Sequence, residues 1–368
     1  MNIKEYIKEQ RLITDGAMGT YYEEKYSEDT VIAEKENLKN PEQIKEIHLE
    51  YLRAGARLIR TNTFAANTMF LADMQEVKET VRAGYEIAKE AVTAFQAENG
   101  KEIPVFIGAD LGPIYDLDHQ DYDNVLQEYK EICDTFLSCG ADCFVFETQS
   151  DFTYIEPVTA YIKEKSDAFI LVQFAFDKSG YTRSGLSMQR VAVEASEMEN
   201  VDAYGFNCEL DSTHMYQFMK NLKFSSDKFV SALPNAGYPY TLRGKTIYSN
   251  NASYYAEKMK DIAALGTDIL GGCCGTTPEY IALLSGELQD VPKATIENVV
   301  TQEVTRTPSI FEEKLSRGEK AYIVELDPPF SEDASKVMKG AEDLRKCNVD
   351  LITLSDSPMA RARMDAGQ

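Results

Sequence analysis

A short turn motif that precedes apolar segments constrains the fold of this chain most. It occurs at Gly55-Ala56-Arg57, Gly140-Ala141-Asp142 and Gly266-Thr267-Asp268, and with asparagine in first place at Asn200-Val201-Asp202. Glycine and asparagine suit the left-handed residue that follows a helix, so each copy indicates a helix-to-strand turn. The motif therefore predicts an α/β protein in which helices alternate with parallel strands.

Eight short apolar segments fit the strands of such a sheet. They are residues 12–14, 56–60, 105–107, 143–146, 169–174, 203–206, 229–232 and 269–270. Eight strands alternating with helices over residues 1–290 fit a (β/α)8 TIM barrel, and a doubly wound open sheet is the alternative. We prefer the barrel because the polar clusters follow the C-terminal ends of the strands, which a barrel gathers in one mouth.

The remainder of the chain has a different pattern. Periodicity weakens over residues 291–317, which we predict to be a linker with a short helix over 310–315. Residues 318–368 then resume with a strand at 322–324, a helix at 334–347 and a strand at 351–354. Two strands and one helix cannot cover both faces of a parallel sheet, so we predict an incomplete α/β fragment of a second domain.

The charge and cysteine content exclude several classes of function. The formal net charge is −23, whereas nucleic-acid and anionic-membrane surfaces need clustered Lys and Arg, so we expect neither partner. No apolar run approaches the roughly 18 residues that span a bilayer, and the first ten residues do not read as a secretory signal. Seven cysteines do not suit a disulfide framework in a chain of 368 residues. We expect a cytoplasmic enzyme with reduced thiols.

Three cysteines are candidate metal ligands. Cys273 and Cys274 follow the eighth strand, just before a helix start at Thr277-Pro278, where the helix dipole favours thiolate. Cys208 follows the sixth strand, and strand ends converge in a barrel. Catalytic Zn²⁺ takes three protein ligands and keeps one open position, so these thiols predict a zinc site. The alternatives are reduced, half-buried thiols or a vicinal disulfide.

Two carboxylates would stand beside this metal. Asp15 follows the first strand in a Gly-rich loop whose N–H groups suit a ligand carboxylate, and Glu147 closes the fourth strand. Glu147 is either a turn residue or a ligand for an ammonium group. The combination suits a zwitterionic amino acid with a thiol, which zinc would bind as thiolate at neutral pH. That sulfur would attack an activated methyl group.

The motifs together resemble the homocysteine S-methyltransferase family over about residues 1–290. They are Asp15–Thr20, Thr61–Phe64, Phe146-Glu147-Thr148, Asn207-Cys208, Pro234–Gly237 and Gly271–Gly275. The resemblance implies a zinc barrel that methylates homocysteine to methionine, with the zinc held by Cys208, Cys273 and Cys274.

The same resemblance assigns the substrate contacts. It implies that Asp15, Gly16 and Glu147 hold the amino and carboxylate groups of homocysteine, and that Asn235 approaches the metal when substrate is absent. The further candidates within these motifs are Ala17, Thr61 and Asn62. One motif departs from the family, because many relatives carry Ser-x-Gly-Pro where this chain has Ala109-Asp110-Leu111-Gly112-Pro113.

The C-terminal segments Val324–Pro329 and Asp356–Arg363 resemble the start of a methylenetetrahydrofolate reductase domain. Such a domain occurs in bifunctional proteins that join the two activities, and Glu325 matches its catalytic glutamate. Most of that second barrel is missing here, so we predict no reductase activity and expect FAD only in a full-length reductase domain.

The resemblance to a bifunctional protein bears on the methyl donor, because a methylenetetrahydrofolate reductase produces methyltetrahydrofolate. We expect methyltetrahydrofolate, used directly or through a corrinoid protein. The chain has no cobalamin-type Asp-x-His-x-x-Gly motif, so any corrinoid must come on a partner. One alternative is S-methylmethionine as donor. Another is a non-catalytic thiol- or metal-binding barrel that serves the missing domain.

Overall fold

A computed structural model provides the structure of this chain. It describes residues 2–26, 32–100, 102–114, 122–224, 227–242, 245–248, 251–288, 291, 293, 310–327, 335–347 and 349–354. The chain divides into two compact units, Met1–Val299 and Val300–Gln368.

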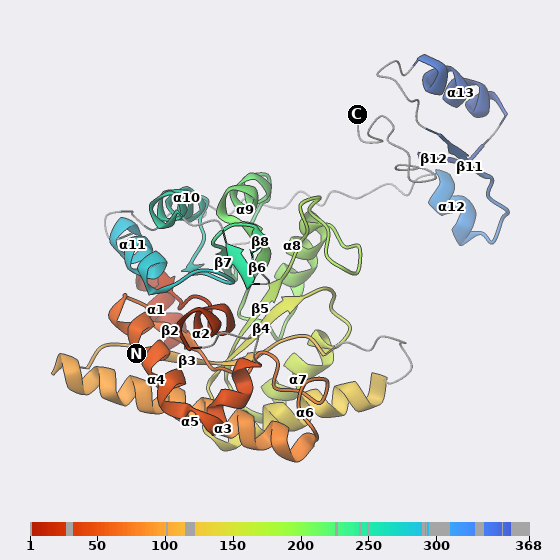
Figure 1. Cartoon of the computed structure of the whole chain (residues 1–368). Helices are drawn as coiled ribbons and strands as arrows, with labels where there is room; N and C mark the ends of the chain where they lie inside the picture. The colour runs from red at the N-terminus through yellow and green to blue at the C-terminus, as the bar shows by residue number, and fades with distance from the viewer. Residues whose placement is uncertain are drawn as a thin grey trace. The chain divides into compact units, whose positions relative to one another are not determined.

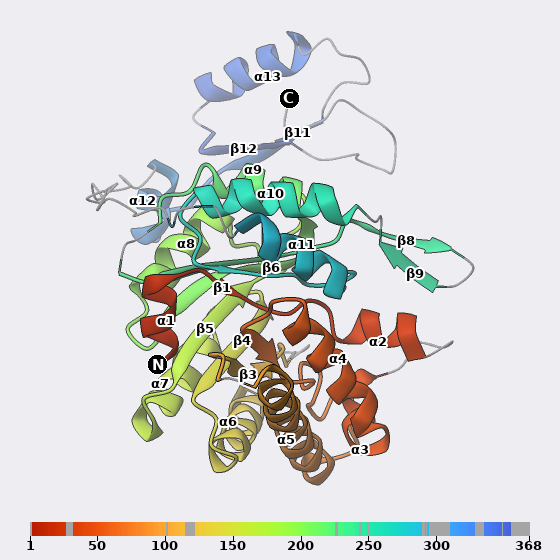
Figure 2. The same ribbon diagram turned by 90° about the vertical axis from the view of Figure 1, so that its left-hand side faces the viewer.

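Eight parallel strands form the sheet of the first unit (Figures 1 and 2). They are β1 (Leu12–Ile13), β2 (Leu58–Arg60), β3 (Phe106–Leu111), β4 (Cys143–Gln149), β5 (Phe169–Phe174), β6 (Ala203–Asp211), β7 (Phe229–Asn235) and β10 (Ile269–Leu270). The strand order is β1-β10-β7-β6-β5-β4-β3-β2, and a parallel bridge between Thr14 and Leu58 joins the two ends. The predicted (β/α)8 barrel is confirmed, and the open-sheet alternative is wrong.

Helices separate the strands and surround the barrel (Figure 2). They are α4 (Pro41–Arg53), α5 (Met74–Asn99), α6 (Tyr122–Ser138), α7 (Ile155–Lys165), α8 (Met188–Glu197), α9 (Ser212–Met219), α10 (Ala252–Ala264) and α11 (Pro278–Leu288). Four short elements precede α4, namely α1 (Ile3–Glu9), α2 (Gly19–Tyr26), η1 (Ala33–Lys35) and α3 (Glu36–Lys39). A hairpin that the sequence did not predict, β8 (Pro239–Leu242) and β9 (Lys245–Tyr248), lies between β7 and α10.

The repeated turn motif has the expected backbone in three of its four copies. Gly55, Gly140 and Gly266 have φ values of 110°, 86° and 97°, in the left-handed region that glycine adopts without penalty. The N–H of Ala56 returns to the carbonyl of Tyr51, as in a helix that ends on a left-handed residue. Asn200 does not have a positive φ, but the fourth copy lies between α8 and β6, so the helix-to-strand turn is confirmed there without the left-handed residue.

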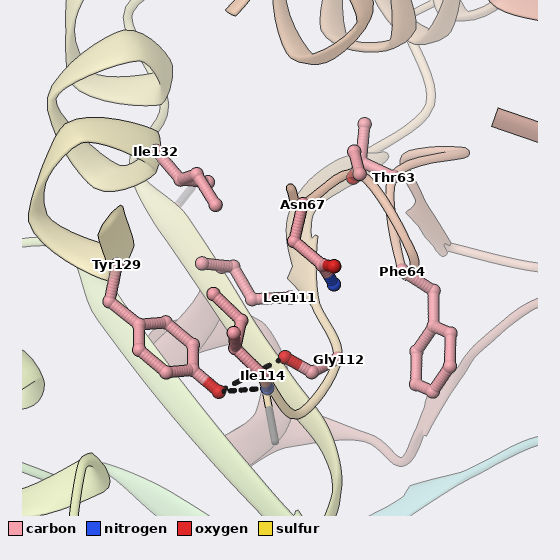
Figure 3. A pocket seen from close by; sticks show the side chains of 9 residues that line it. Thr63, Phe64, Asn67, Leu111, Gly112, Ile114, Tyr129 and Ile132 are labelled. Carbon is pink, nitrogen blue, oxygen red and sulfur yellow. Dashed lines mark hydrogen bonds between the residues drawn. The ribbon is translucent and has the colours of Figure 1, made fainter. Parts of the chain in front are cut away.

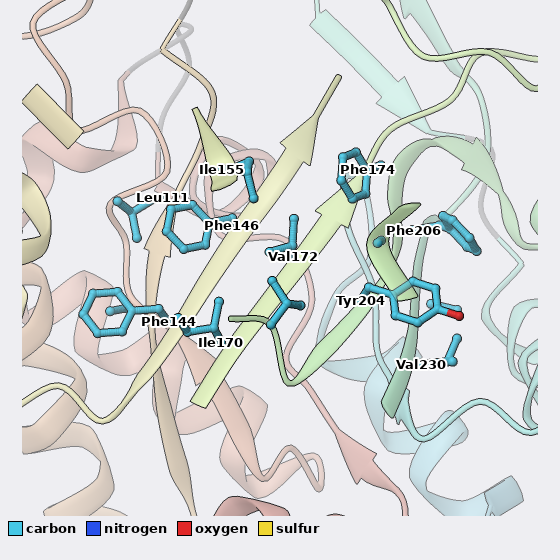
Figure 4. Close-up of a cluster of buried hydrophobic side chains, with 14 of the residues drawn as sticks. Leu111, Phe144, Phe146, Ile155, Ile170, Val172, Phe174, Tyr204, Phe206 and Val230 are labelled. Carbon is cyan, nitrogen blue, oxygen red and sulfur yellow. The ribbon is translucent and has the colours of Figure 1, made fainter. Parts of the chain in front are cut away.

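The core follows the two-residue alternation of the strands. On β4 and β5, Phe144, Phe146, Ile170 and Val172 belong to the large cluster shown in Figure 4. Their neighbours in sequence contribute to a second cluster, drawn from strands all around the ring and from α1. That cluster fills the barrel interior with the side chains of Ile3, Tyr6, Ile7, Leu12, Leu58, Cys143, Val145, Phe169, Leu171, Ala203 and Ile269.

The inward-facing rows continue toward the barrel mouth with polar residues. On β4 the row runs from Cys143 through Val145 to Glu147. We expected Glu147 just past the fourth strand, but β4 continues to Gln149 and contains it. The third strand likewise extends to Leu111, so Asp110 is a strand residue and not a loop residue. The strands therefore carry charged side chains directly into the upper barrel.

The second unit contains α12 (Ile310–Ser316), β11 (Ile323–Leu326), α13 (Ser335–Lys346) and β12 (Leu351–Leu354). Its two strands pair in parallel, and the element order is the predicted one. Among the residues of this unit whose burial the structure describes, none is buried, and Glu325 is exposed on β11. The reductase resemblance and the domain boundaries stay predictions. In the described parts of both units, no helix is long and apolar enough to cross a membrane.

Candidate functional site

Three cysteine thiols meet at the barrel mouth. Cys208 comes from β6, and Cys273 and Cys274 follow β10. Their Sγ atoms all lie within 4.8 Å of one another, and Cys208 Sγ is 3.6 Å from Cys274 Sγ. All three are free cysteines, so the adjacent pair does not form a disulfide here. The structure thus brings together the three residues that the sequence proposed as metal ligands.

Unusual backbone geometry aims Cys208 at the other thiols. Cys208, Glu209 and Thr148 have φ values of 58°, 52° and 58°, and the pairing register shifts at these points in β4 and β6. Asn207 links the two irregular strands: the N–H of Thr148 donates to its Oδ1 at 2.9 Å, and its Nδ2 donates to Thr148 Oγ1 at 3.1 Å. Left-handed backbone at a non-glycine residue costs about 1–3 kcal/mol and clusters at functional sites.

The turn after β10 fits closely against the first strand. A Cβ on Gly271 would lie 1.9 Å from Thr14 Oγ1, so only glycine allows this approach. The N–H of Gly272 donates to the Asp15 carbonyl at 3.1 Å, and the N–H of Cys273 donates to the Pro234 carbonyl at 2.9 Å. The cysteine pair and the Asp15 loop are therefore held as one assembly.

The pKa values of the clustered thiols shift in opposite directions. The pKa of Cys274 is lowered well below the ordinary value because the thiols of Cys208 and then Cys273 donate hydrogen bonds to its sulfur. The pKa of Cys273 is raised by the same interactions and by burial. The cluster therefore already favours a thiolate, the form that binds metal ions.

An arginine that the sequence analysis missed organises the acidic side of the site. Arg60 Nε donates to Asp15 Oδ1 at 2.7 Å, its backbone N–H donates to Asp15 Oδ2 at 2.8 Å, and Nη1 donates to Glu147 Oε1. Nη2 donates to the carbonyls of Gly16 at 2.7 Å and Gly272 at 2.8 Å. One buried guanidinium thus connects both predicted substrate-binding carboxylates to the cysteine turn.

Burial and neighbouring charges together set the pKa values of these groups. It raises the pKa of Asp15 to about 6 despite the adjacent Arg60. Burial lowers the pKa of Arg60, but Asp15 and Glu147 outweigh it and the net shift is well upward. Arg60 therefore stays charged across the physiological range.

A cavity of about 290 Å³ unites these residues. The predicted site residues that line it are Asp15, Gly16, Ala17, Thr61, Asn62, Glu147, Cys208, Cys273 and Cys274. Arg60, Glu34 and Asp110, which were not predicted as site residues, also line it. Asn235 is not part of this lining; it lies buried at the end of β7, and its Oδ1 has no hydrogen-bond partner among the described residues.

Thr61 and Asn62 also have partners within the protein. Thr61 Oγ1 accepts the N–H of Asp110 at 3.0 Å. Asn62 Nδ2 donates to the Ala33 carbonyl at 2.7 Å and to Asn37 Oδ1 at 2.8 Å. Both side chains therefore shape the cavity wall by fixing neighbouring segments.

A second, much smaller pocket lies beside the loop that follows β3 (Figure 3). Its volume is about 10 Å³, which suits no more than a water molecule. Tyr129 anchors the loop there by accepting the N–H of Ile114 at 2.8 Å and donating to the Gly112 carbonyl at 3.3 Å. The contact supports β3 and provides no substrate site.

The fold and the site together define a (β/α)8 barrel with three converging thiols at its mouth. The homocysteine S-methyltransferase family model matches residues 12–288, so the chain belongs to that family. Methionine synthase from Mycobacterium leprae (strain TN) is 26% identical over 371 residues, covering 94% of this chain and 30% of the relative. The chain thus spans less than a third of that relative's length.

Solved structures support the same fold. The metallated homocysteine methyltransferase MmuM from Escherichia coli superposes with a TM-score of 0.63 at 24% identity, covering 77% of this chain and 98% of that chain. Its apo form has a TM-score of 0.61 at 26% identity, covering 76% and 96%. Both are barrels of the same architecture.

Proposed function

We propose that this chain catalyses zinc-dependent transfer of a methyl group to the thiol of L-homocysteine, giving L-methionine. The donor is methyltetrahydrofolate, used directly or through a corrinoid protein. The observation that carries the proposal is the convergence of three thiols in the cavity that also contains Asp15 and Glu147, in a member of this family. The likeness to a methionine synthase supports it.

The donor atoms fit a catalytic zinc site. Three sulfur ligands within 4.8 Å of one another suit Zn²⁺ and leave a fourth position for substrate. We assign the metal to Cys208, Cys273 and Cys274, and the buried Oδ1 of Asn235 is a further candidate ligand when substrate is absent. A bound zinc ion supplies Lewis acidity that lowers the pKa of a thiol, so that its sulfur is nucleophilic at neutral pH.

The residues of the chain provide binding and orientation. The Asp15-Gly16-Ala17 loop and Glu147 bind the amino and carboxylate ends of the substrate from the cavity wall. Arg60 keeps the two carboxylates in place, and Thr61 and Asn62 hold the adjoining wall. Because the cavity orients the thiol when the substrate binds, part of the entropic cost of the reaction is met before the chemical step, and the activation barrier is lower.

Elemental analysis tests the metal assignment. We expect about one zinc per purified chain, and Cys208→Ser, Cys273→Ser and Cys274→Ser should each lose most of it, because zinc strongly prefers thiolate ligands here. The exposed Cys347 provides the control, since Cys347→Ser should retain the zinc. Stoichiometric zinc in all three site variants would contradict the assignment.

A panel of methyl donors tests the reaction. Methionine formed from methyltetrahydrofolate, alone or with a corrinoid protein, supports the leading proposal. Methionine formed only from S-methylmethionine supports the second donor. If no donor yields methionine while zinc and homocysteine still bind, the chain is a non-catalytic thiol- or metal-binding barrel.

We further propose a barrel domain over residues 1–290, a linker over 291–317 and a reductase-like segment over 318–368. The order β11-α13-β12 supports an α/β segment of this kind. Glu325 matches the reductase glutamate, and we expect no reductase activity from this chain and no FAD bound to it.

A further inference from the structure

Three adjacent strands end their inward rows in charged side chains. Arg60 follows Leu58 on β2, and Glu147 follows Val145 on β4. Between them, Asp110 follows Gly108 on β3, and a Cβ on Gly108 would lie 2.7 Å from Val145 Cγ2. β3 lies between β2 and β4 in the sheet, so Asp110 is on the strand between those that carry Arg60 and Glu147.

The partners of these carboxylates differ. Arg60 engages both oxygens of Asp15 and Oε1 of Glu147. Asp110 is only 4% exposed and lines the cavity, yet its Oδ1 has no hydrogen-bond partner among the residues that the structure describes. A buried polar atom without a partner is costly, so such an atom in a cavity wall indicates the place of a ligand's donor group.

The charge balance of the cavity specifies the donor group. Its described lining contains Asp15, Glu34, Asp110 and Glu147 but one cationic side chain, Arg60. Burial and then the charge of Glu147 raise the pKa of Asp110 well above its ordinary value, although the charge of Arg60 acts in the opposite direction. An ammonium group has three N–H donors and a positive charge. It would therefore donate a hydrogen bond to Asp110 Oδ1 and offset part of the excess negative charge.

We propose that Asp110, beside Glu147, receives the ammonium group of the amino-acid substrate and selects for it. This inference rests on the proposed function, since it takes homocysteine as the substrate. Both oxygens of Asp15 already accept hydrogen bonds from Arg60, whereas Asp110 Oδ1 has no such partner among the described residues. Asp110 is thus a specificity-determining residue of this chain.

The test compares two thiols that differ in one group. The zinc-loaded full chain is titrated calorimetrically with homocysteine and with 4-mercaptobutanoate, which lacks the amino group. The wild-type chain should prefer homocysteine. Asp110→Asn should weaken homocysteine binding by about 10- to 100-fold, as expected for loss of a charged hydrogen bond, and leave 4-mercaptobutanoate binding nearly unchanged. Retained binding of 4-mercaptobutanoate also shows that the variant is folded.

Glu34→Gln is the matched control. Glu34 lines the same cavity, but its Oε1 already accepts the N–H of Ala65 at 2.8 Å, so this variant should keep the wild-type preference. Equal weakening of both thiols by Asp110→Asn, or of neither, overturns the proposal and leaves the proposed function standing. So does a wild-type chain that binds both thiols equally well. A wild-type chain that binds neither overturns the proposed function and this inference with it.

Discussion

At the scale of single residues, Arg60 shows what local sequence reasoning could and could not find. The three cysteines were found because their chemistry is distinctive and each follows a recognisable strand. Arg60 closes a strand in the same way, but an arginine there is usually read as a solvated charge. Its partners Asp15 and Glu147 are 45 and 87 residues away, so only the closed barrel shows that it is a buried link.

Replacing Arg60 should therefore be severe. Arg60→Met leaves Asp15 and Glu147 buried without their cation, and we expect unfolding free energy to fall by about 3–5 kcal/mol. Urea denaturation measures this. Arg53→Met is the control: Arg53 also binds two carboxylates, Glu46 and Glu98, but at the surface, where the loss should be below about 1 kcal/mol. Similar losses in the two variants would contradict the buried role.

At the scale of elements, the sequence predicted the eight barrel strands in order but misjudged where several of them end. Asp110 and Glu147 look like loop residues because they are polar, yet they extend the inward rows of β3 and β4. The hairpin β8–β9 was missed because no helix or second turn motif marks it in the sequence. Hydrophobic patterns therefore predict the apolar part of each strand but not its extension into polar residues that line the cavity.

The linked irregularities in β4 and β6 give an element-scale prediction. Asn207→Ala removes both hydrogen bonds to Thr148, so Cys208 loses the support that fixes its backbone. Groups that orient metal ligands typically contribute 10- to 100-fold in affinity, and we expect zinc affinity to fall by about that factor. Competition with a chelator measures the change. Asn221→Ala is the control, because Asn221 bonds only the nearby Gln217 carbonyl among the contacts described for it. Unchanged zinc affinity in Asn207→Ala would show that the thiols need no such support.

At the scale of the whole molecule, the barrel has the components of an independent domain. Its strand ring is closed, and every buried hydrophobic residue in the described chain belongs to the first unit. We expect a chain of residues 1–299 to fold with a melting temperature within a few degrees of the full chain and to retain its zinc. Calorimetric melting and elemental analysis check this. Loss of cooperative unfolding in the shorter chain would contradict it.

The short strands β1 and β10 affect where the barrel opens in native-state fluctuations. β1 and β10 have two residues each, so few backbone hydrogen bonds join them at the seam where the Asp15 loop meets the cysteine turn. Regions with few backbone hydrogen bonds open first in native-state fluctuations. Opening at this seam would separate Asp15 from Gly272 and so part the Asp15 loop from the cysteine turn. A ligand that contacts both the Asp15 loop and the cysteine turn would hold β1 and β10 together. Ligand binding should therefore slow amide hydrogen exchange in these two strands.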